Sequence, residues 1–168
     1  MRQVQQKRAF TLLELIILIT ILGFMVLIAI PNVSSYLDAR IYSCAQKISS
    51  DIRYTQYLSI AEHKSYGVVF NASNNYYRVY EVDTGNLAID PYSRADMELD
   101  LDATEEYKGV SISSVNIDSS NEIRFSSLGE PLNSSGNVLA SLGTIILNYS
   151  GKSKMVTMYP VTGWVEVQ

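Results

Sequence analysis

The pattern of apolar residues changes twice along the chain. Residues 10–30 are almost uniformly apolar, and Glu14 is their only charged residue. As a helix these 21 residues would extend about 31 Å at about 1.5 Å per residue, close to the roughly 30 Å hydrocarbon core of a bilayer. The pattern therefore predicts a membrane-spanning helix over residues 10–30.

After Pro31 the apolar positions follow a helical period. Their spacings are four, four, three, four and four residues, at Val33, Leu37, Ile41, Cys44, Ile48 and Ile52. We expect an amphipathic helix over residues 31–62 that ends near residues 61–65 and lays one face on a sheet. With residues 10–30 it would form one long helix, broken or bent at Gly23 and Pro31.

Beyond this helix the apolar period becomes two, which predicts short strands. These strands are expected at residues 66–70, 76–82, 109–117, 122–126, 144–149, 154–159 and 163–167. Turn-forming Gly, Asn and Ser residues separate them, which favours antiparallel pairing. The expected fold class is α+β, with a long N-terminal helix packed on antiparallel β-sheets and a β-rich head over residues 63–168.

Glu14 needs an explanation, because a carboxylate inside an apolar helix costs about 2.5–3.5 kcal/mol at the centre of a bilayer. The cost is smaller near a helix N-terminus, so one interpretation is a tolerated interfacial acid on an ordinary anchor. The other is a cut between Ala9 and Phe10, which would create an ammonium group one helical turn from Glu14. That cation could pair with Glu14 of the same chain or of a neighbouring chain.

The sequence KRAFTLLELIILITILGF at residues 7–24 resembles the N-terminus of type IV prepilins and type II secretion pseudopilins. The resemblance implies that residues 1–9 are a basic leader that prepilin peptidase removes. It also implies that Phe10 becomes the N-methylated first residue, with Ala9 standing where Gly usually precedes the cut. Glu14 then lies at the fifth mature position, the position of the acid needed for assembly in this family.

Two further features follow from the same resemblance. Gly23 and Pro31 fall where helices of this family are usually interrupted. Residues 10–30 would serve first as a transmembrane helix and later as the core of a filament, packed against the helices of other subunits. The expected partners are other pseudopilins, prepilin peptidase, the inner-membrane assembly platform and the lipid bilayer.

The head is similar to that of H-type minor pseudopilins and FimT-type minor pilins. The similarity rests on the helix-to-strand join, the F-x-x-x-G turn at Phe125 and Gly129, and the late T-G pair at Thr162 and Gly163. It implies a minor pseudopilin, a structural and non-enzymatic subunit of the periplasmic pseudopilus of a type II secretion system. The alternatives are a minor pilin of a type IV pilus or a DNA-uptake minor pilin. Residues 83–108 have no counterpart in this resemblance.

The charge balance bears on location and partners. The chain has 13 basic and 17 acidic side chains, and residues 9–37 contain no Lys or Arg. The positive-inside rule then places the N-terminus in the cytoplasm and the head in the periplasm of a bacterial inner membrane. A cleaved secretory signal is the alternative, although its apolar run is usually only about 7–15 residues.

Without residues 1–9 the chain keeps 10 basic and 17 acidic side chains, so nucleic acid is not an expected partner. The sequence ends in GWVEVQ, without the basic tail that a DNA-uptake minor pilin should carry.

Few residues suggest catalysis or metal binding, so neither a cofactor nor a metal is expected. Cys44 is the only cysteine, which excludes an intrachain disulfide, and it should pack as a small apolar residue. His63 is the only histidine and should be solvated or cap the helix. Gly151-Lys152-Ser153 lacks the first glycine of a phosphate loop, where Ile146 stands, and is expected to be a turn.

Two stretches allow both a structural and a functional interpretation. Acids alternate with apolar residues over 96–107, which favours a charged, solvated edge strand, with a calcium site over 96–106 as the alternative. Several tyrosines gather near the helix-to-hairpin join and should pack half-buried on a sheet face, although they could also stack on bases; they are Tyr54, Tyr57, Tyr66, Tyr76, Tyr77 and Tyr80.

Overall fold

A computed structural model of the chain describes residues 10–29 and 33–168. The chain separates into two compact units, Met1–Val33 and Ser34–Gln168. The first unit contains helix α1 (Leu12–Ala29), and helix α2 (Val33–Glu62) leads into the second. The expected leader at residues 1–9, the cleavage-site residue Ala9 and the expected interruption at Pro31 lie outside the described residues.

Helix α1 begins with a side-chain cap. The backbone N–H of Glu14 donates to Thr11 Oγ1 at 3.3 Å, and the Glu14 carboxylate occupies the first turn, where the helix dipole favours negative charge. The helix continues through Gly23, and the expected interruption at this residue stays a prediction. Glycine costs only about 1 kcal/mol in a helix interior, and the apolar helix-forming residues around it outweigh that cost.

Among the described residues, none of the helices has the length and apolar content required to cross a membrane. The expected span of residues 10–30 includes Ile30, which is not among them. The membrane-spanning segment therefore stays a prediction.

Helix α2 carries the predicted apolar stripe. Ile41, Cys44, Ile48 and Ile52 are all fully buried, which confirms the periodicity. The helix ends at Glu62 because His63 takes a left-handed conformation with φ of 55°, and the N–H of Lys64 closes the last turn on the carbonyl of Ser59 at 3.2 Å. The end lies within the predicted interval.

The head contains two antiparallel sheets. One has the strand order β3-β2-β1-β5-β6 and the other β4-β7-β8-β9. The strands are β1 (Tyr66–Asn71), β2 (Tyr76–Glu81), β3 (Glu98–Asp100), β4 (Ser111–Asn116), β5 (Glu122–Phe125), β6 (Pro131–Leu132), β7 (Gly143–Tyr149), β8 (Lys152–Met158) and β9 (Val165–Val167). The α+β class with antiparallel sheets on a long helix is confirmed.

Turn residues move some strand ends away from their predicted positions. Strand β4 starts at Ser111 because Gly109 has φ of +89°, and β9 starts at Val165 because Gly163 has φ of +67°. Both conformations lie outside the extended region. The predicted β1–β2 hairpin is confirmed, with Tyr66 opposite Glu81. Strand β6 was not predicted, because two residues are too few to show an alternating apolar pattern.

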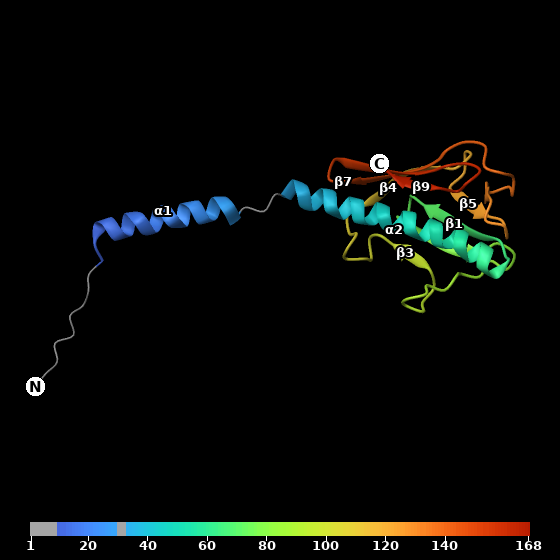
Figure 1. The fold of residues 1–168 in the computed structure, drawn as a ribbon, viewed down its shortest axis with the longest axis horizontal. Helices are drawn as coiled ribbons and strands as arrows, with labels where there is room; N and C mark the ends of the chain where they lie inside the picture. The colour runs from blue at the N-terminus through green and yellow to red at the C-terminus, as the bar shows by residue number, and fades with distance from the viewer. Residues whose placement is uncertain (1–9, 30–32) are drawn as a thin grey trace, which may run out of the picture. The chain divides into compact units, whose positions relative to one another are not determined.

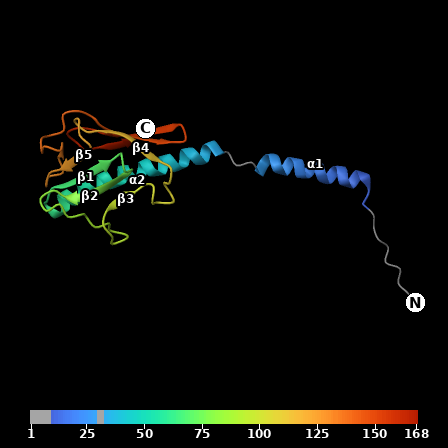
Figure 2. The same ribbon diagram turned by 180° about the vertical axis from the view of Figure 1, so that it is seen from behind.

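Helix α2 and both sheets share one core. Phe70 and Phe125 of the first sheet are fully buried, and Ile145 and Leu147 of the second are at most 1% exposed. Figures 1 and 2 show α2 running along the strands, while the yellow-green segment around β3 projects on the side opposite the C-terminus. The apolar face of α2 is therefore covered by both sheets.

Replacing Phe125 with alanine should lower the free energy of unfolding by about 3–5 kcal/mol, because its ring is fully buried in this core. Urea titration followed by circular dichroism measures the change. The matched control is Leu128→Ala in the following turn, where the side chain is 78% exposed and the effect should stay within about 0.5 kcal/mol. Equal losses in the two variants would contradict the shared core.

Candidate functional site

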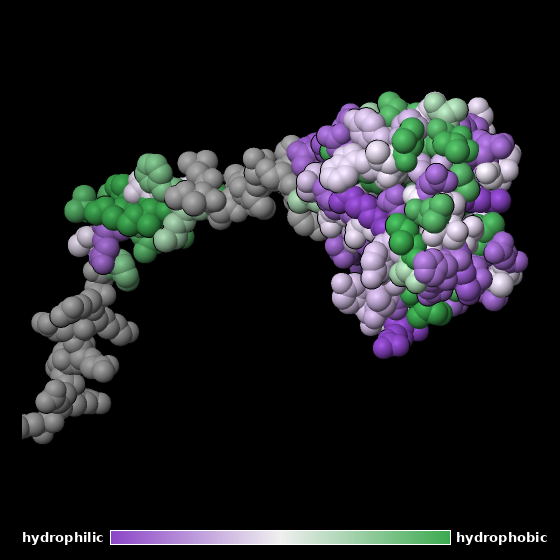
Figure 3. All heavy atoms as spheres, turned by 45° about the vertical axis from the view of Figure 1, so that its right-hand side comes forward, coloured by the Kyte–Doolittle hydropathy of each residue, from purple (hydrophilic) through white to green (hydrophobic). Residues whose placement is uncertain are grey.

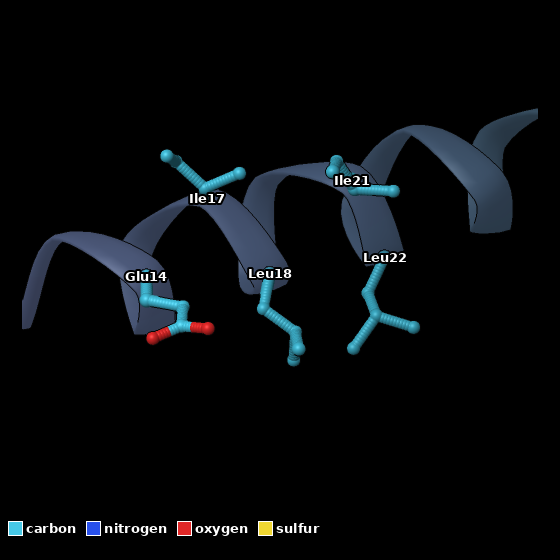
Figure 4. Close-up of a pocket in the computed structure, with 5 residues that line it drawn as sticks. All are labelled: Glu14, Ile17, Leu18, Ile21 and Leu22. Atoms are coloured by element: carbon cyan, nitrogen blue, oxygen red, sulfur yellow. The ribbon is translucent and has the colours of Figure 1, made fainter. Parts of the chain in front are cut away.

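The first candidate site is the surface of α1 around Glu14. In Figure 4, Glu14, Leu18 and Leu22 form one row on the helix, Ile17 and Ile21 form a neighbouring row, and all five side chains line one shallow hollow. The spacing of four residues places the carboxylate at the head of an apolar row. The site therefore consists of one charge followed by a continuous apolar surface.

This apolar surface is open within its unit. Ile17, Leu18, Ile21 and Leu22 are each 50–52% exposed, and Figure 3 shows hydrophobic residues covering the described part of α1. Soluble monomers rarely leave such a large apolar patch uncovered. The exposed apolar side chains of α1 therefore favour contact with lipid or with other helices.

Neither Glu14 nor Phe10 has the expected charge partner within the described residues. No ion pair found there includes Glu14, and the ammonium group expected on Phe10 would exist only after the cut. Their pairing, the cut before Phe10 and its methylation stay predictions.

In the head, one α2 side chain joins the two motifs that suggested the family. Gln56 Nε2 donates to the carbonyl of Gly129 at 2.8 Å and to that of Thr162 at 3.0 Å. Gly129 has φ of +81°, and a Cβ on Gly163 would lie 2.7 Å from Gln56 Nε2. The F-x-x-x-G turn and the T-G pair therefore meet on α2. Sequence reasoning missed Gln56, which nothing in the apolar periodicity marks.

Sequence reasoning also missed Asp51, a buried acid on α2 that lies directly before Ile52 of the apolar stripe. Its carboxylate accepts a hydrogen bond from Tyr77 Oη at 2.5 Å and pairs with Lys47 Nζ at 2.8 Å. Burial raises the pKa of Asp51, and these two partners oppose the rise. Burial and the nearby Asp51 raise the pKa of Tyr77 well above its ordinary value. A polar link thus connects α2 to β2 inside an otherwise apolar contact.

The remaining candidate groups have structural positions. Cys44 is buried as predicted, and burial, with a smaller contribution from Glu106, raises its pKa to about 12. His63 is exposed at the end of α2. Gly151 lies in the tight turn between β7 and β8, with φ of +82°, as expected for a turn. Within residues 10–29 and 33–168, no three metal-ligating side chains gather at one place.

The acidic stretch forms an edge strand over only part of its length. Strand β3 pairs with β2 at the edge of its sheet, with Glu98 and Asp100 exposed and Met97 and Leu101 buried at its ends. The strand stops there because Asp100 Oδ1 accepts hydrogen bonds from the backbone N–H groups of Asp102 and Ala103 and closes a turn. The prediction of a strand over 96–107 is therefore correct for residues 98–100 alone.

The tyrosines near the join mostly pack as predicted. Tyr66 and Tyr77 are buried, Tyr54, Tyr76 and Tyr80 are half-buried, and Tyr57 is 65% exposed. Stacking on bases would require exposed rings, and Tyr57 is the only member of this group with more than half of its surface exposed.

Solved structures establish the fold class. The minor pseudopilin EpsH from the type 2 secretion system of Vibrio cholerae matches with a TM-score of 0.55 and 14% identity, over 77% of this chain and 96% of EpsH. The type IV minor pilin FimU of Pseudomonas aeruginosa matches with a TM-score of 0.50 and 10% identity, over 78% and 88%. The fold is pilin-like. None of the family models matches this sequence, and no curated protein does.

The Gln56 contact in this pilin-like head can be tested with two glycines of similar conformation. Gly163→Ala and Gly136→Ala both place a side chain at positive φ, which costs about 1–2 kcal/mol. Gly163→Ala should cost about 1–3 kcal/mol more, because its Cβ displaces the Gln56 amide from two carbonyls, whereas a Cβ on Gly136 meets nothing within 4 Å. Urea unfolding measures both, and similar losses would contradict the role of Gln56.

Proposed function

We propose that the chain is a minor pseudopilin, a structural subunit of the periplasmic pseudopilus of a type II secretion system. One observation carries the proposal: an exposed apolar helix with a single carboxylate in its first turn belongs to the same chain as a pilin-like head. The pilin-like fold is typically non-enzymatic, which agrees with a structural role. The match to EpsH, which has the higher TM-score and the larger share of its own length covered, supports a pseudopilus.

The proposed assembly begins in the inner membrane, with the N-terminus cytoplasmic and the head periplasmic. Prepilin peptidase would cut between Ala9 and Phe10, and methylation of Phe10 would follow. The new ammonium group would then pair with Glu14, on the same chain or on a neighbouring subunit. Both charges would lie at apolar depth, where an unpaired ion is costly.

The apolar row of α1 would pack against equivalent helices of other pseudopilins. Burying one such side chain from water yields about 1.5–3 kcal/mol, but transfer from lipid yields much less because lipid tails are already apolar. Close helix packing and the charge pair of Glu14 must therefore supply the specificity. The inner-membrane assembly platform would supply the work of extraction from the bilayer.

A minor pilin of a type IV pilus is the second candidate, favoured by the similarity to FimU. In that role the same subunit would prime a surface fibre for adhesion or motility. A DNA-uptake role has less support, because residues 10–168 hold 17 acidic but only 10 basic side chains, and binding to phosphates depends on Lys and Arg. The secretion and pilus candidates share every step that involves α1 and differ in the partners of the head.

Glu14→Leu should leave the helix in the membrane but lower incorporation into filaments at least about tenfold, equivalent to about 1.4 kcal/mol, because the new N-terminus loses its partner. Immunoblotting of membrane and sheared filament fractions measures both quantities. Glu130→Leu is the matched control, since it removes an exposed carboxylate of the head. Normal incorporation of the Glu14 variant would refute the proposed assembly mechanism.

Mass spectrometry of the protein isolated from its own cells tests the processing step separately. The mature chain should begin at Phe10 and carry one methyl group on its amine. Loss of prepilin peptidase should restore the mass that includes residues 1–9. A working chain that still begins at Met1 would exclude the cut.

A further inference from the structure

The net charge of the protein is concentrated in one segment. Residues 83–106 contain eight acidic side chains and a single basic one, Arg94. The rest of residues 10–168 holds nine acidic and nine basic side chains, so the segment accounts for the whole excess of negative charge. It projects from the head on the side opposite the C-terminus in both ribbon views (Figures 1 and 2).

This segment encloses a cavity against α2. The half-open cavity has a volume of about 390 Å³, and its lining includes Lys47, Asp51, Tyr54, Asp90, Tyr92 and Met97. A second hollow shares four of these residues and adds Asp96 and Glu98. The lining thus combines an apolar base at Met97, which is 5% exposed, with two tyrosines and several carboxylates.

The carboxylates around the cavity are unevenly compensated. Lys47 pairs with the buried Asp51 at 2.8 Å. No ion pair within the described parts of the chain includes Asp90, Asp96 or Glu98. Asp90 is also ionised at neutral pH, because backbone N–H bonds, from Ser93 above all, lower the pKa of its carboxyl.

Two tyrosines complete a site suited to a cation with an apolar stem. Tyr92 is 95% exposed at the mouth of the cavity, and Tyr54 lines it from α2. Aromatic faces attract ammonium and guanidinium groups, and a long aliphatic side chain can pack on Met97 behind the charge. The other acidic side chains of residues 83–106 would attract further basic residues of the same ligand.

We propose that this cavity receives a lysine or arginine side chain from a basic segment of a partner polypeptide, which docks on the acidic surface of residues 83–106. The side chain enters between Tyr54 and Tyr92, and its charge meets Asp90. The inference does not depend on which filament the subunit joins, because it rests on the head alone.

The experiment uses the full chain in neutral detergent and a fluorescein-labelled hexapeptide with two arginines, at about 50 mM salt so that screening stays weak. Fluorescence anisotropy should show the arginine peptide binding at least about tenfold more tightly than the same peptide with neutral citrulline. Equal binding of the two peptides, or no binding of either, would overturn the proposal.

Two variants locate the site. Asp90→Asn should weaken binding about tenfold, because Asn keeps the Oδ1 atom that accepts the N–H groups of Tyr92 and Ser93 but loses the charge. Tyr92→Ala should weaken it about threefold. Glu130→Gln removes the same charge from an exposed site elsewhere and should leave affinity within about twofold.

The controls separate the cavity from general acidity and from an ion site. An unchanged melting temperature in Asp90→Asn shows that lost binding is not unfolding. Equal weakening by Glu130→Gln would mean that only net charge matters, which refutes the cavity. Calcium chloride alone is the last probe: calorimetric binding abolished by Asp90→Asn, with no peptide binding, would assign the acids to a metal ion instead.

Discussion

The burial of one helical stripe against two sheets is the contact on which the whole head depends. Ile41, Cys44, Ile48 and Ile52 lie at helical spacing and are fully buried. Neither sheet has a complete core of its own, since the buried residues of both surround this stripe. Around the stripe, the Gln56 amide binds the loops at Gly129 and Thr162, and the Asp51 carboxylate binds Tyr77 of β2. These polar contacts fix the positions of two loops and a strand against the helix.

Helix α1 presents the opposite physical situation. The large apolar side chains of residues 12–26 are 45–79% exposed, and this unit contains no sheet. An exposed apolar surface of this kind favours contact with lipid or other helices over contact with water, which agrees with the proposed storage in a membrane and later assembly. The carboxylate of Glu14 is then the only ionic group of α1 that could discriminate one neighbour from another.

The acidic segment 83–106 gives the head a surface that differs in chemistry from the apolar surface of α1. Proteins that share a fold differ in the sites that the fold carries, so function is argued from such sites. Here residues 83–106 hold eight acidic side chains and one basic one, and they line a cavity beside α2. In the proposed subunit, α1 would supply the surface for packing and residues 83–106 the surface for recognition.

The sequence by itself determined the long helices, most strands and the candidate assembly residues, because their periods and the isolated Glu14 are local features of the chain. Only the tertiary structure decided where β4 and β9 begin, because the backbone conformations of Gly109 and Gly163 delay them. Pairing between distant segments decided the order of the strands in the two sheets and the short length of β3. Gln56, Asp51 and the cavity under Tyr92 needed the tertiary structure, because each joins residues far apart in the chain. Hydrogen bonds of this kind leave no periodic signal in a sequence.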